Sequence, residues 1–283
     1  MAILPAGDGG HEHEGPLPSA NWPGARSAEG SPVSKWVQGK VVGHRHWTGR
    51  LHSLQVAAPE VTFVAGQFGR LALPAPPGAK EEMLGRPYSF VNAPGTQPHE
   101  FYFVTVPAGP LSPRLAALAH GDAVWLLRSA NGFFTASELP DAEVLWCLST
   151  GTGLGPFLSI LRTAEPWAKF HRVVLVHAVR HASELTYGEV IAGIAAAHAG
   201  AFVYIPMVSR EAHPGALAGR IPDAIRDGRL ESRAGLALAA DNSHAMLCGN
   251  PQMVDDVQKA LEARGMRRHR RREPGQVTVE TYW

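Results

Sequence analysis

The hydrophobic pattern of this chain changes at about residue 139, and this change constrains the fold more than any other feature. Before it, short runs carry β-forming residues or alternating apolar and polar residues, and Gly and Pro separate them. These runs span residues 40–47, 51–57, 67–73, 87–92, 100–106 and 123–128. Residues 112–119 interrupt them with apolar side chains at helical spacing. We expect the first part of the chain to form a closed antiparallel β-barrel.

After residue 139 the β-forming runs are almost continuously apolar, as expected for strands buried on both faces. They span residues 144–149, 172–179, 201–208 and 245–248, and a final run spans 276–280. Helical segments alternate with them at residues 156–163, 187–198, 222–229 and 251–264, and Gly265 is placed to end the last one. Because such alternation builds parallel sheets, we expect an α/β parallel-sheet domain over residues 139–283 after a barrel domain over residues 34–138.

Residues 1–33 are rich in Gly, Pro, Ala and Ser and lack helical or strand periodicity, so we expect a disordered or irregular extension. His11 and His13 lie there, and His44 and His46 are also two residues apart. A mobile tail lacks a fixed set of ligands, and any strand places alternate side chains on one face. We therefore predict no metal site from either pair.

Composition excludes several classes of protein. The chain has 26 Lys and Arg against 25 Asp and Glu, a net charge of +1, which gives no reason to expect a nucleic-acid partner. No apolar run approaches the roughly 20 residues that span a bilayer, and no basic stretch followed by an apolar one marks a secretory signal. The two cysteines, Cys147 and Cys248, lie in apolar runs, which suits a reducing compartment. We expect a cytoplasmic protein without a membrane segment.

The motif Arg86-Pro87-Tyr88-Ser89 lies in a predicted barrel strand. Its Arg can neutralise a pyrophosphate, its Tyr can pack on a flat ring, and its Ser can hydrogen-bond a polar ring edge, as a flavin with phosphate groups requires. An ordinary strand with an exposed Arg and a buried Tyr would contain the same residues, so this alternative stays open.

The motif Pro110-Leu111-Ser112-Pro113 opens the helix predicted within the barrel. Ser112 suits the N-cap and Pro113 the first helical position, which leaves backbone N–H groups for an anion such as phosphate. Plain helix capping would use the same residues, so a phosphate site is one of two interpretations.

A Gly-rich turn, residues 151–156, follows directly after the first continuous apolar run. Glycine allows the backbone to approach a cofactor closely, and Pro156 is expected to start a helix whose N-terminus favours phosphate. The spacing departs from the G-x-G-x-x-G motif, so a tight turn without a ligand is the alternative.

Arginines follow the predicted parallel strands at Arg180, Arg210 and Arg220. Ligands of open α/β sheets bind beyond the carboxyl ends of the strands, and several cations there suit a phosphorylated ribose. Glu184 and Glu211 are nearby, and a carboxylate would instead suit an unphosphorylated ribose, so the arginines favour NADP over NAD without excluding the latter.

Cys248 and Gly249 close the last apolar run before the final helix, where a thiol can border a nicotinamide or fill a small buried space. A basic cluster follows, consisting of Arg264, Arg267, Arg268, Arg270, Arg271 and Arg272. Such a cluster can dock an acidic partner, bind nucleic acid or be solvated. It has no interleaved aromatic residues, which disfavours nucleic acid.

In this order the motifs resemble the ferredoxin–NADP⁺ reductase family, in particular its bacterial ferredoxin/flavodoxin type. The resemblance covers residues 36–283 and rests on the stretches RPYSFVNAP, EFYFVTVPAGPLSPRLAALAHGD, GFF, STGTGLGPFLSILR, VHAVRHASEL, VSRE, GRIPDAI, MLCGNPQMV and VETYW. It implies an FAD-binding antiparallel barrel followed by an NADP-binding α/β domain. The implied activity is electron transfer between NADPH and ferredoxin or flavodoxin, and we expect a monomer.

The resemblance also assigns the site residues. FAD would be bound by Arg86, Pro87, Tyr88, Ser89, Tyr102, Val104, Val106, Pro110, Leu111, Ser112, Thr152, Tyr282 and Trp283. NADP would be bound by Thr152, Gly153, Val179, Arg180, Ser209, Arg210, Arg220, Cys248 and Gly249. The hydride-transfer point would be surrounded by Ser89, Cys248 and Glu280, with Tyr282 covering the flavin ring.

Two other functions stay open at this point. The chain could be a reductase component that supplies an oxygenase, or a flavin-binding redox sensor without turnover. A fused [2Fe–2S] domain is excluded, because two widely separated cysteines cannot supply the four ligands of such a cluster.

Overall fold

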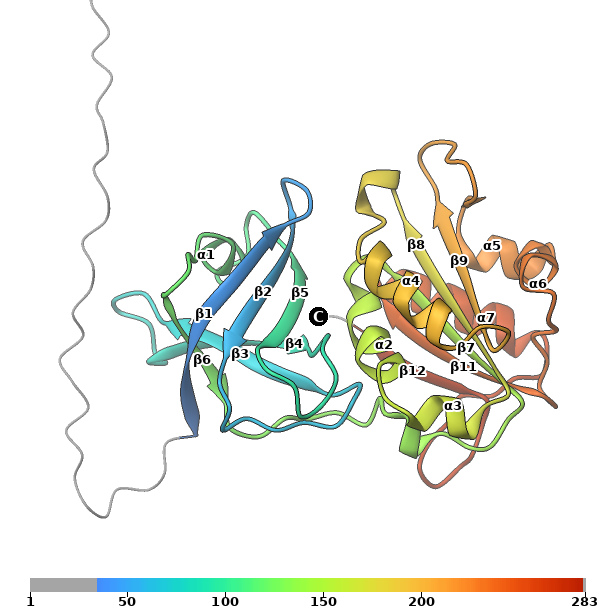
Figure 1. Ribbon diagram of the computed structural model, residues 1–283, viewed down its shortest axis with the longest axis horizontal. Helices are drawn as coiled ribbons and strands as arrows, with labels where there is room; N and C mark the ends of the chain where they lie inside the picture. The colour runs from blue at the N-terminus through green and yellow to red at the C-terminus, as the bar shows by residue number, and fades with distance from the viewer. Residues whose placement is uncertain (1–34, 282–283) are drawn as a thin grey trace, which may run out of the picture. The chain divides into compact units, whose positions relative to one another are not determined.

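An antiparallel six-stranded sheet forms the first part of the protein (Figure 1). The computed structural model describes residues 35–281. The strands are β1 (Trp36–His46), β2 (Leu51–Ala57), β3 (Phe68–Pro74), β4 (Met83–Ser89), β5 (His99–Val104) and β6 (Ala123–Leu127), in the order β4-β3-β6-β1-β2-β5. A bridge between Phe90 and Phe101 joins the two edges, because the chain leaving β4 pairs with β5. The predicted closed antiparallel barrel is therefore confirmed.

The helix within the barrel, α1 (Ser112–Ala116), is shorter than the predicted segment 112–119. Its N-cap is Leu111, so the prediction of Ser112 as the N-cap is wrong. The side chain of Leu111 is buried in the barrel core, and the hydroxyl of Ser112 accepts a hydrogen bond of 2.9 Å from the Val106 N–H. Ser112 is therefore the first residue of the helix, and its hydroxyl stabilises the turn that precedes it.

The second part of the chain is a parallel six-stranded sheet with helices between the strands. Its strands are β7 (Val144–Thr150), β8 (Arg172–Val179), β9 (Phe202–Val208), β10 (Leu217–Ala218), β11 (Ser243–Gly249) and β12 (Val277–Thr281), in the order β10-β9-β8-β7-β11-β12. The helices are α2 (Leu154–Leu161), α3 (Glu165–Lys169), α4 (Gly188–Ala197), α5 (Ile221–Arg226), α6 (Arg229–Ala234) and α7 (Pro251–Glu262). Short 3₁₀ turns are η1 (Ala136–Glu138), η2 (Gly151–Gly153) and η3 (Ala182–Glu184). The predicted α/β architecture is confirmed.

Both faces of the parallel sheet are covered by apolar side chains, which explains the nearly continuous apolar runs. On β7, Trp146 and Leu148 contribute to one cluster, with residues of α5 and α7. Leu145 and Cys147 contribute to a second cluster, with residues of α2 and α4. This second cluster also contains barrel residues such as Tyr102, so the barrel and the parallel sheet share a hydrophobic core.

Several boundaries differ from the predicted ones because of glycines and short turns. Helix α2 begins at Leu154 rather than at Pro156, because turn η2 leads directly into it. The helix predicted over residues 222–229 ends at Arg226, since Gly228 adopts φ +75°, outside the right-handed helical region, and a second helix that was not predicted, α6, begins at Arg229. Gly265, with φ +79°, follows α7 as expected of a glycine that ends a helix.

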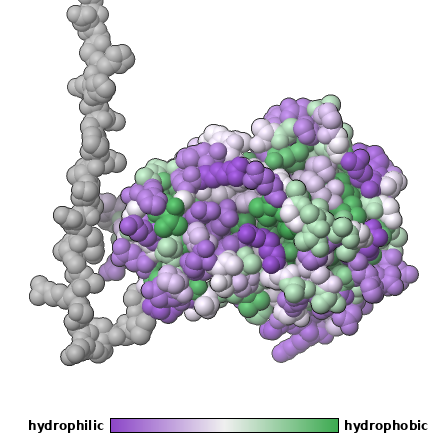
Figure 2. Space-filling view, viewed as in Figure 1, coloured by the Kyte–Doolittle hydropathy of each residue, from purple (hydrophilic) through white to green (hydrophobic). Residues whose placement is uncertain are grey.

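The surface combines polar and apolar residues. On the face in Figure 2, hydrophilic and hydrophobic residues are interspersed. Large apolar side chains that are exposed among residues 35–281 include Val106 and Phe133, and the guanidinium of Arg271 lies 4.5 Å from the centre of the Phe133 ring. No helix in the described part of the chain combines the length and apolar character needed to cross a membrane.

Candidate functional site

The carboxyl ends of β7, β8, β9, β11 and β12 lie at one edge of the parallel sheet. The pairing continues beyond β8 and β9, because the Ser209 N–H donates to the Val179 carbonyl at 3.1 Å and the Arg210 N–H to the Arg180 carbonyl at 2.9 Å. The strand order reverses between β7 and β11, and open α/β sheets bind ligands at such a point. This edge is therefore the expected nucleotide-binding crevice.

Two glycines allow close contact between the ends of β7 and β11. A Cβ atom on Gly153 would lie 2.3 Å from the carbonyl oxygen of Cys248. A Cβ atom on Gly249, which has φ +136°, would lie 2.2 Å from the Thr150 hydroxyl oxygen. At Gly153, glycine is therefore required by packing within the protein, whereas the sequence interpretation had invoked the approach of a cofactor. Thr152, between these contacts, is half-buried.

Ser89, Cys248 and Glu280 come together although they are far apart in the sequence. Cys248 lies directly opposite Glu280 in the parallel pair of β11 and β12, so both side chains are on the same face of the sheet. The carboxylate of Glu280 accepts a hydrogen bond from the side chain of Ser89, the last residue of β4. The Ser89 and Cys248 side chains are both buried. The barrel and the parallel sheet thus contribute to one cluster of polar groups.

Glu280 contributes the carboxyl group of this cluster, and the pKa of that group is raised. Burial raises its pKa to about 7, and the hydrogen bond from Ser89 opposes part of that rise. Its Oε2 atom is buried and has no hydrogen-bond partner among the described residues. A carboxyl group that is partly protonated near neutral pH can hold or release a proton, and the vacant oxygen fits a polar group of a ligand.

The barrel strand β4 presents the predicted flavin-binding residues in different environments. Arg86 and Pro87 are exposed, and one N–H of Arg86 donates to the Gly85 carbonyl at 2.9 Å. Tyr88 is half-buried with its ring edge-on to Phe103 at 5.8 Å, and burial raises its pKa to about 12. A neutral Tyr ring with one accessible side fits a flat apolar ligand, and the Arg86 guanidinium is accessible to a phosphate.

Strand β5 and the turn after it contain the next predicted residues. Tyr102 is buried and its hydroxyl accepts a hydrogen bond of 2.9 Å from Thr186, whereas Val104 is half-buried and Val106 is exposed. Pro110 is exposed in the following turn. Because Tyr102 is only 4% exposed, Val104 and Val106 offer a ligand more accessible surface than it does.

The predicted cations lie together at the edge of the sheet. Arg180 and Arg210 are neighbours through their backbone hydrogen bond, and Arg220 follows β10, the strand that pairs with β9. All three side chains are exposed, and within residues 35–281 no hydrogen bond or ion pair occupies their guanidinium groups. They are available to a phosphate.

The two acidic residues near these cations are used within the protein. The carboxylate of Glu184 accepts hydrogen bonds from the backbone N–H groups of Arg180 and His181. The carboxylate of Glu211 accepts a hydrogen bond of 2.6 Å from the Ala182 N–H, which lowers its pKa. Backbone N–H groups thus hold both carboxylates in place, and the three exposed arginines beside them favour a 2′-phosphate over a 2′-hydroxyl.

Sequence reasoning missed Tyr187, which links the two parts of the fold. It was predicted as the first residue of a helix, but it adopts φ 59° and precedes α4. Its hydroxyl lies 2.5 Å from Ser53 Oγ on β2 and donates to Glu100 Oε1 on β5 at 2.8 Å. A left-handed non-glycine residue is unusual, and its buried hydrogen bonds stabilise this conformation. No local pattern predicts such a contact.

The arginine cluster predicted at residues 264–272 is partly used in ion pairs within the protein. Arg264 is partly buried and pairs with Glu231 at 2.6 Å, so it stabilises the packing of α6 and α7. Arg270 pairs with a nearby carboxylate, and Arg271 forms two 3.0 Å hydrogen bonds to Glu138. The exposed arginines left for a partner are Arg267, Arg268 and Arg272. Tyr282 and Trp283, like residues 1–34, lie outside the described residues.

The fold and the strand-edge site define a nucleotide-dependent oxidoreductase. Residues 147–259, which contain the Gly-rich turn and the exposed arginines, match the model of the oxidoreductase NAD-binding domain. The chain is 48% identical over 252 residues to the flavodoxin/ferredoxin–NADP reductase of Shigella flexneri and 47% identical to that of Escherichia coli strain K12. Each alignment covers 89% of this chain and 100% of the relative. The protein belongs to the flavodoxin/ferredoxin–NADP reductase family.

A solved structure agrees with this assignment. A ferredoxin NADP⁺ reductase from Neisseria gonorrhoeae, crystallised with bound FAD and NADP, superimposes with a TM-score of 0.82 and 32% sequence identity. The superposition covers 88% of this chain and 100% of that one. The arrangement of a barrel followed by a parallel sheet is thus the arrangement of a reductase in this family.

Proposed function

We propose that the barrel binds FAD, that the edge of the parallel sheet binds NADP(H), and that the protein transfers electrons between NADPH and ferredoxin or flavodoxin. The observation that carries this proposal is the cluster of Ser89, Cys248 and Glu280, which the barrel and two adjacent strands of the parallel sheet form together. The names of the relatives and the FAD and NADP bound to the Neisseria reductase support it.

The FAD site uses the groups of the barrel that have capacity for a ligand. Arg86 binds the pyrophosphate, since its guanidinium is exposed, and Tyr88 packs on the flavin ring. Val104 and Val106 provide apolar surface beside the ring, and Thr152 lies where the flavin and the nicotinamide meet. The Ser112 hydroxyl accepts from the Val106 N–H and can still donate its own hydrogen, so it binds phosphate together with the backbone N–H groups of Leu111 and Ser112.

FAD, when bound, supplies the redox chemistry by accepting a hydride and releasing electrons singly. The chain's own groups prepare the site for it. Ser89 orients the Glu280 carboxyl, and burial keeps that carboxyl partly protonated near neutral pH, with a pKa of about 7. Glu280 thus holds an exchangeable proton beside the hydride-transfer point, and Cys248 fills the space between the strand ends.

The NADP site is formed by the exposed cations at the edge of the sheet. Arg180, Ser209, Arg210 and Arg220 bind the phosphates, mainly the 2′-phosphate, while the backbone at Gly153, Val179 and Gly249 lines the crevice. This assignment rests on the three guanidinium groups, which no described residue engages, and on the carboxylates of Glu184 and Glu211, which accept backbone hydrogen bonds.

The terminal aromatics Tyr282 and Trp283 cover the flavin where nicotinamide must enter, as the resemblance implies. Truncation after Thr281 is therefore expected to raise NADP⁺ affinity and to weaken the preference for NADPH over NADH. Titration of NADP⁺ against the flavin absorption spectrum measures the affinity. If both the affinity and the preference are unchanged, the gating role of Tyr282 is rejected.

The proposal also includes the electron-carrier protein, the cellular compartment and the domain boundaries. Ferredoxin or flavodoxin docks with its acidic surface against Arg267, Arg268 and Arg272. The protein acts as a cytoplasmic monomer. The barrel domain spans residues 34–138, and the NADP-binding domain spans residues 139–283.

The decisive experiment follows the visible spectrum of the purified protein. We expect a flavin spectrum that NADPH bleaches much faster than NADH, and reoxidation when ferredoxin or flavodoxin is added. A protein that is colourless and takes up no flavin contradicts the FAD site. Equal rates with NADPH and NADH contradict the 2′-phosphate site, and no reoxidation by either carrier contradicts the reductase activity.

A further inference from the structure

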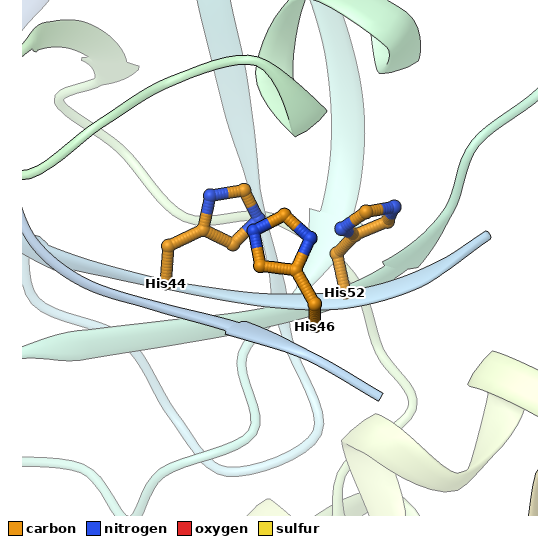
Figure 3. Close-up of side chains that lie close together, drawn as sticks. All are labelled: His44, His46 and His52. Atoms are coloured by element: carbon orange, nitrogen blue, oxygen red, sulfur yellow. The ribbon is translucent and has the colours of Figure 1, made fainter. Parts of the chain in front are cut away.

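Three histidines lie together on one face of the hairpin formed by β1 and β2 (Figure 3). His44 and His46 are two residues apart on β1, and His46 lies directly opposite His52 on β2. The ring centres of His44 and His46 are 4.2 Å apart, and those of His46 and His52 are 4.9 Å apart. One ring nitrogen of each residue lies within 4.8 Å of the other two. This is the geometry of a compact three-imidazole cluster.

Two buried ring nitrogens in this cluster have no hydrogen-bond partner within residues 35–281. His44 Nδ1 lies 2.8 Å from the carbonyl oxygen of Leu118, which only accepts, so Nδ1 carries the hydrogen and Nε2 keeps its lone pair. His44 Nε2 and His52 Nδ1 are both buried, and neither has a partner among the described residues. A backbone carbonyl on the opposite ring nitrogen is the usual support of a metal-binding imidazole.

The groups around the cluster favour a transition-metal ion. Arg45 points to the opposite face of the strand, where its guanidinium lies 3.6 Å from the centre of the Trp47 ring. No carboxylate is part of the cluster. Nitrogen ligands without oxygen ligands suit a transition-metal ion rather than Ca²⁺ or Mg²⁺.

The ring nitrogens lie within 4.8 Å of one another, so rotation of a ring is needed to bring them to the spacing of a metal site. Nitrogens bound tetrahedrally to Zn²⁺, at about 2.0–2.1 Å from the metal, are about 3.3 Å from each other. His46 is exposed, so its ring can rotate toward the two more enclosed rings of His44 and His52. Three protein ligands leave a fourth position for water, and the exposed side of His46 is where that water would enter.

We propose that His44, His46 and His52 bind one divalent transition-metal ion, with Zn²⁺ as the expected occupant. The ion would tie β1 to β2 and, through the Leu118 carbonyl that holds His44, to the segment after α1. The sequence interpretation rejected the pair His44 and His46 because any strand places alternate side chains on one face. His52 completes the set only through the cross-strand register. This site is independent of the proposed reductase activity.

The test uses the full-length protein as purified, freed of metal by a chelator and then titrated with Co²⁺ and Zn²⁺. We expect one equivalent of Co²⁺ to produce the ligand-field absorption of a tetrahedral site, at longer wavelength than the flavin bands, and Zn²⁺ to abolish it. His46→Gln replaces an exposed side chain, so the fold is retained, and it should weaken Zn²⁺ binding by about tenfold or more.

Two controls separate this site from other histidines. His213→Gln changes an exposed histidine outside the cluster, and the double variant His11→Ala/His13→Ala removes the pair in the N-terminal segment; both should bind Zn²⁺ like the wild type. The proposal is overturned if His46→Gln binds Zn²⁺ as tightly as the wild type, or if the N-terminal double variant loses the site. Co²⁺ binding without a tetrahedral spectrum overturns it equally.

Discussion

Replacing Glu280 by Gln should make the protein more stable above pH 7 and leave its stability almost unchanged below about pH 4.5. Burial raises the pKa of Glu280 from 4.5 to about 7. A carboxyl whose pKa is raised by folding favours the folded state only while it is protonated, so the wild type loses stability as the pH rises through about 7. At about 1.4 kcal/mol per pH unit, the loss reaches up to about 3 kcal/mol. Gln has a similar shape and carries no charge, so it avoids this loss.

Thermal unfolding of the wild type and of Glu280→Gln across a series of pH values measures this difference. An advantage of up to about 3 kcal/mol corresponds to a midpoint increase of about 6–12 °C above pH 8. The variant Glu81→Gln, which removes an exposed carboxylate, controls for the loss of one negative charge. A difference between wild type and variant that does not change with pH would refute the reasoning, as would a less stable variant at pH 8.

Three further changes test the site and its support. Ser89→Ala should slow flavin reduction by NADPH about tenfold with FAD retained, the factor that one hydrogen bond of about 1.4 kcal/mol represents; an unaltered pre-steady-state rate rejects this role. Tyr187→Phe should cost about 2 kcal/mol in thermal unfolding, because its hydroxyl makes two buried hydrogen bonds, whereas Tyr204→Phe should cost little; equal losses would contradict this. Arg210→Ala should weaken NADP⁺ binding by about 10- to 100-fold without affecting NAD⁺, and Arg272→Ala should do neither; calorimetry distinguishes these outcomes.

The order and type of the main strands could be predicted because each part of the sequence has a distinct apolar period. Continuous runs such as residues 172–179 need two covered faces, and the structure covers both with helices. The end of α5 at Arg226 was missed because one glycine, Gly228, changes the backbone direction within an otherwise helical pattern, and α6 after it was not predicted. Helical periodicity is judged over several residues, so it does not reveal a change of backbone direction at one of them.

The site was predictable to the extent that strand ends determine it. Arg180 and Arg210 follow neighbouring parallel strands, and the register places them side by side. Contacts across strands or between the two parts of the fold could not be predicted in this way. The partner of Glu280 is Ser89 on a barrel strand, and His52 joins His46 through antiparallel pairing. Such pairs depend on tertiary packing, which no local spacing encodes.

The hydrogen bond between Ser89 and Glu280 couples the protonation of Glu280 to the contact between the barrel strand β4 and the strand β12 of the parallel sheet. Any motion that draws β4 away from β12 would hydrate the Glu280 carboxyl, remove the main cause of its raised pKa and release its proton at neutral pH. Proton uptake and release would then report each opening and closing of the enzyme, so a pH indicator in weak buffer could time this conformational change.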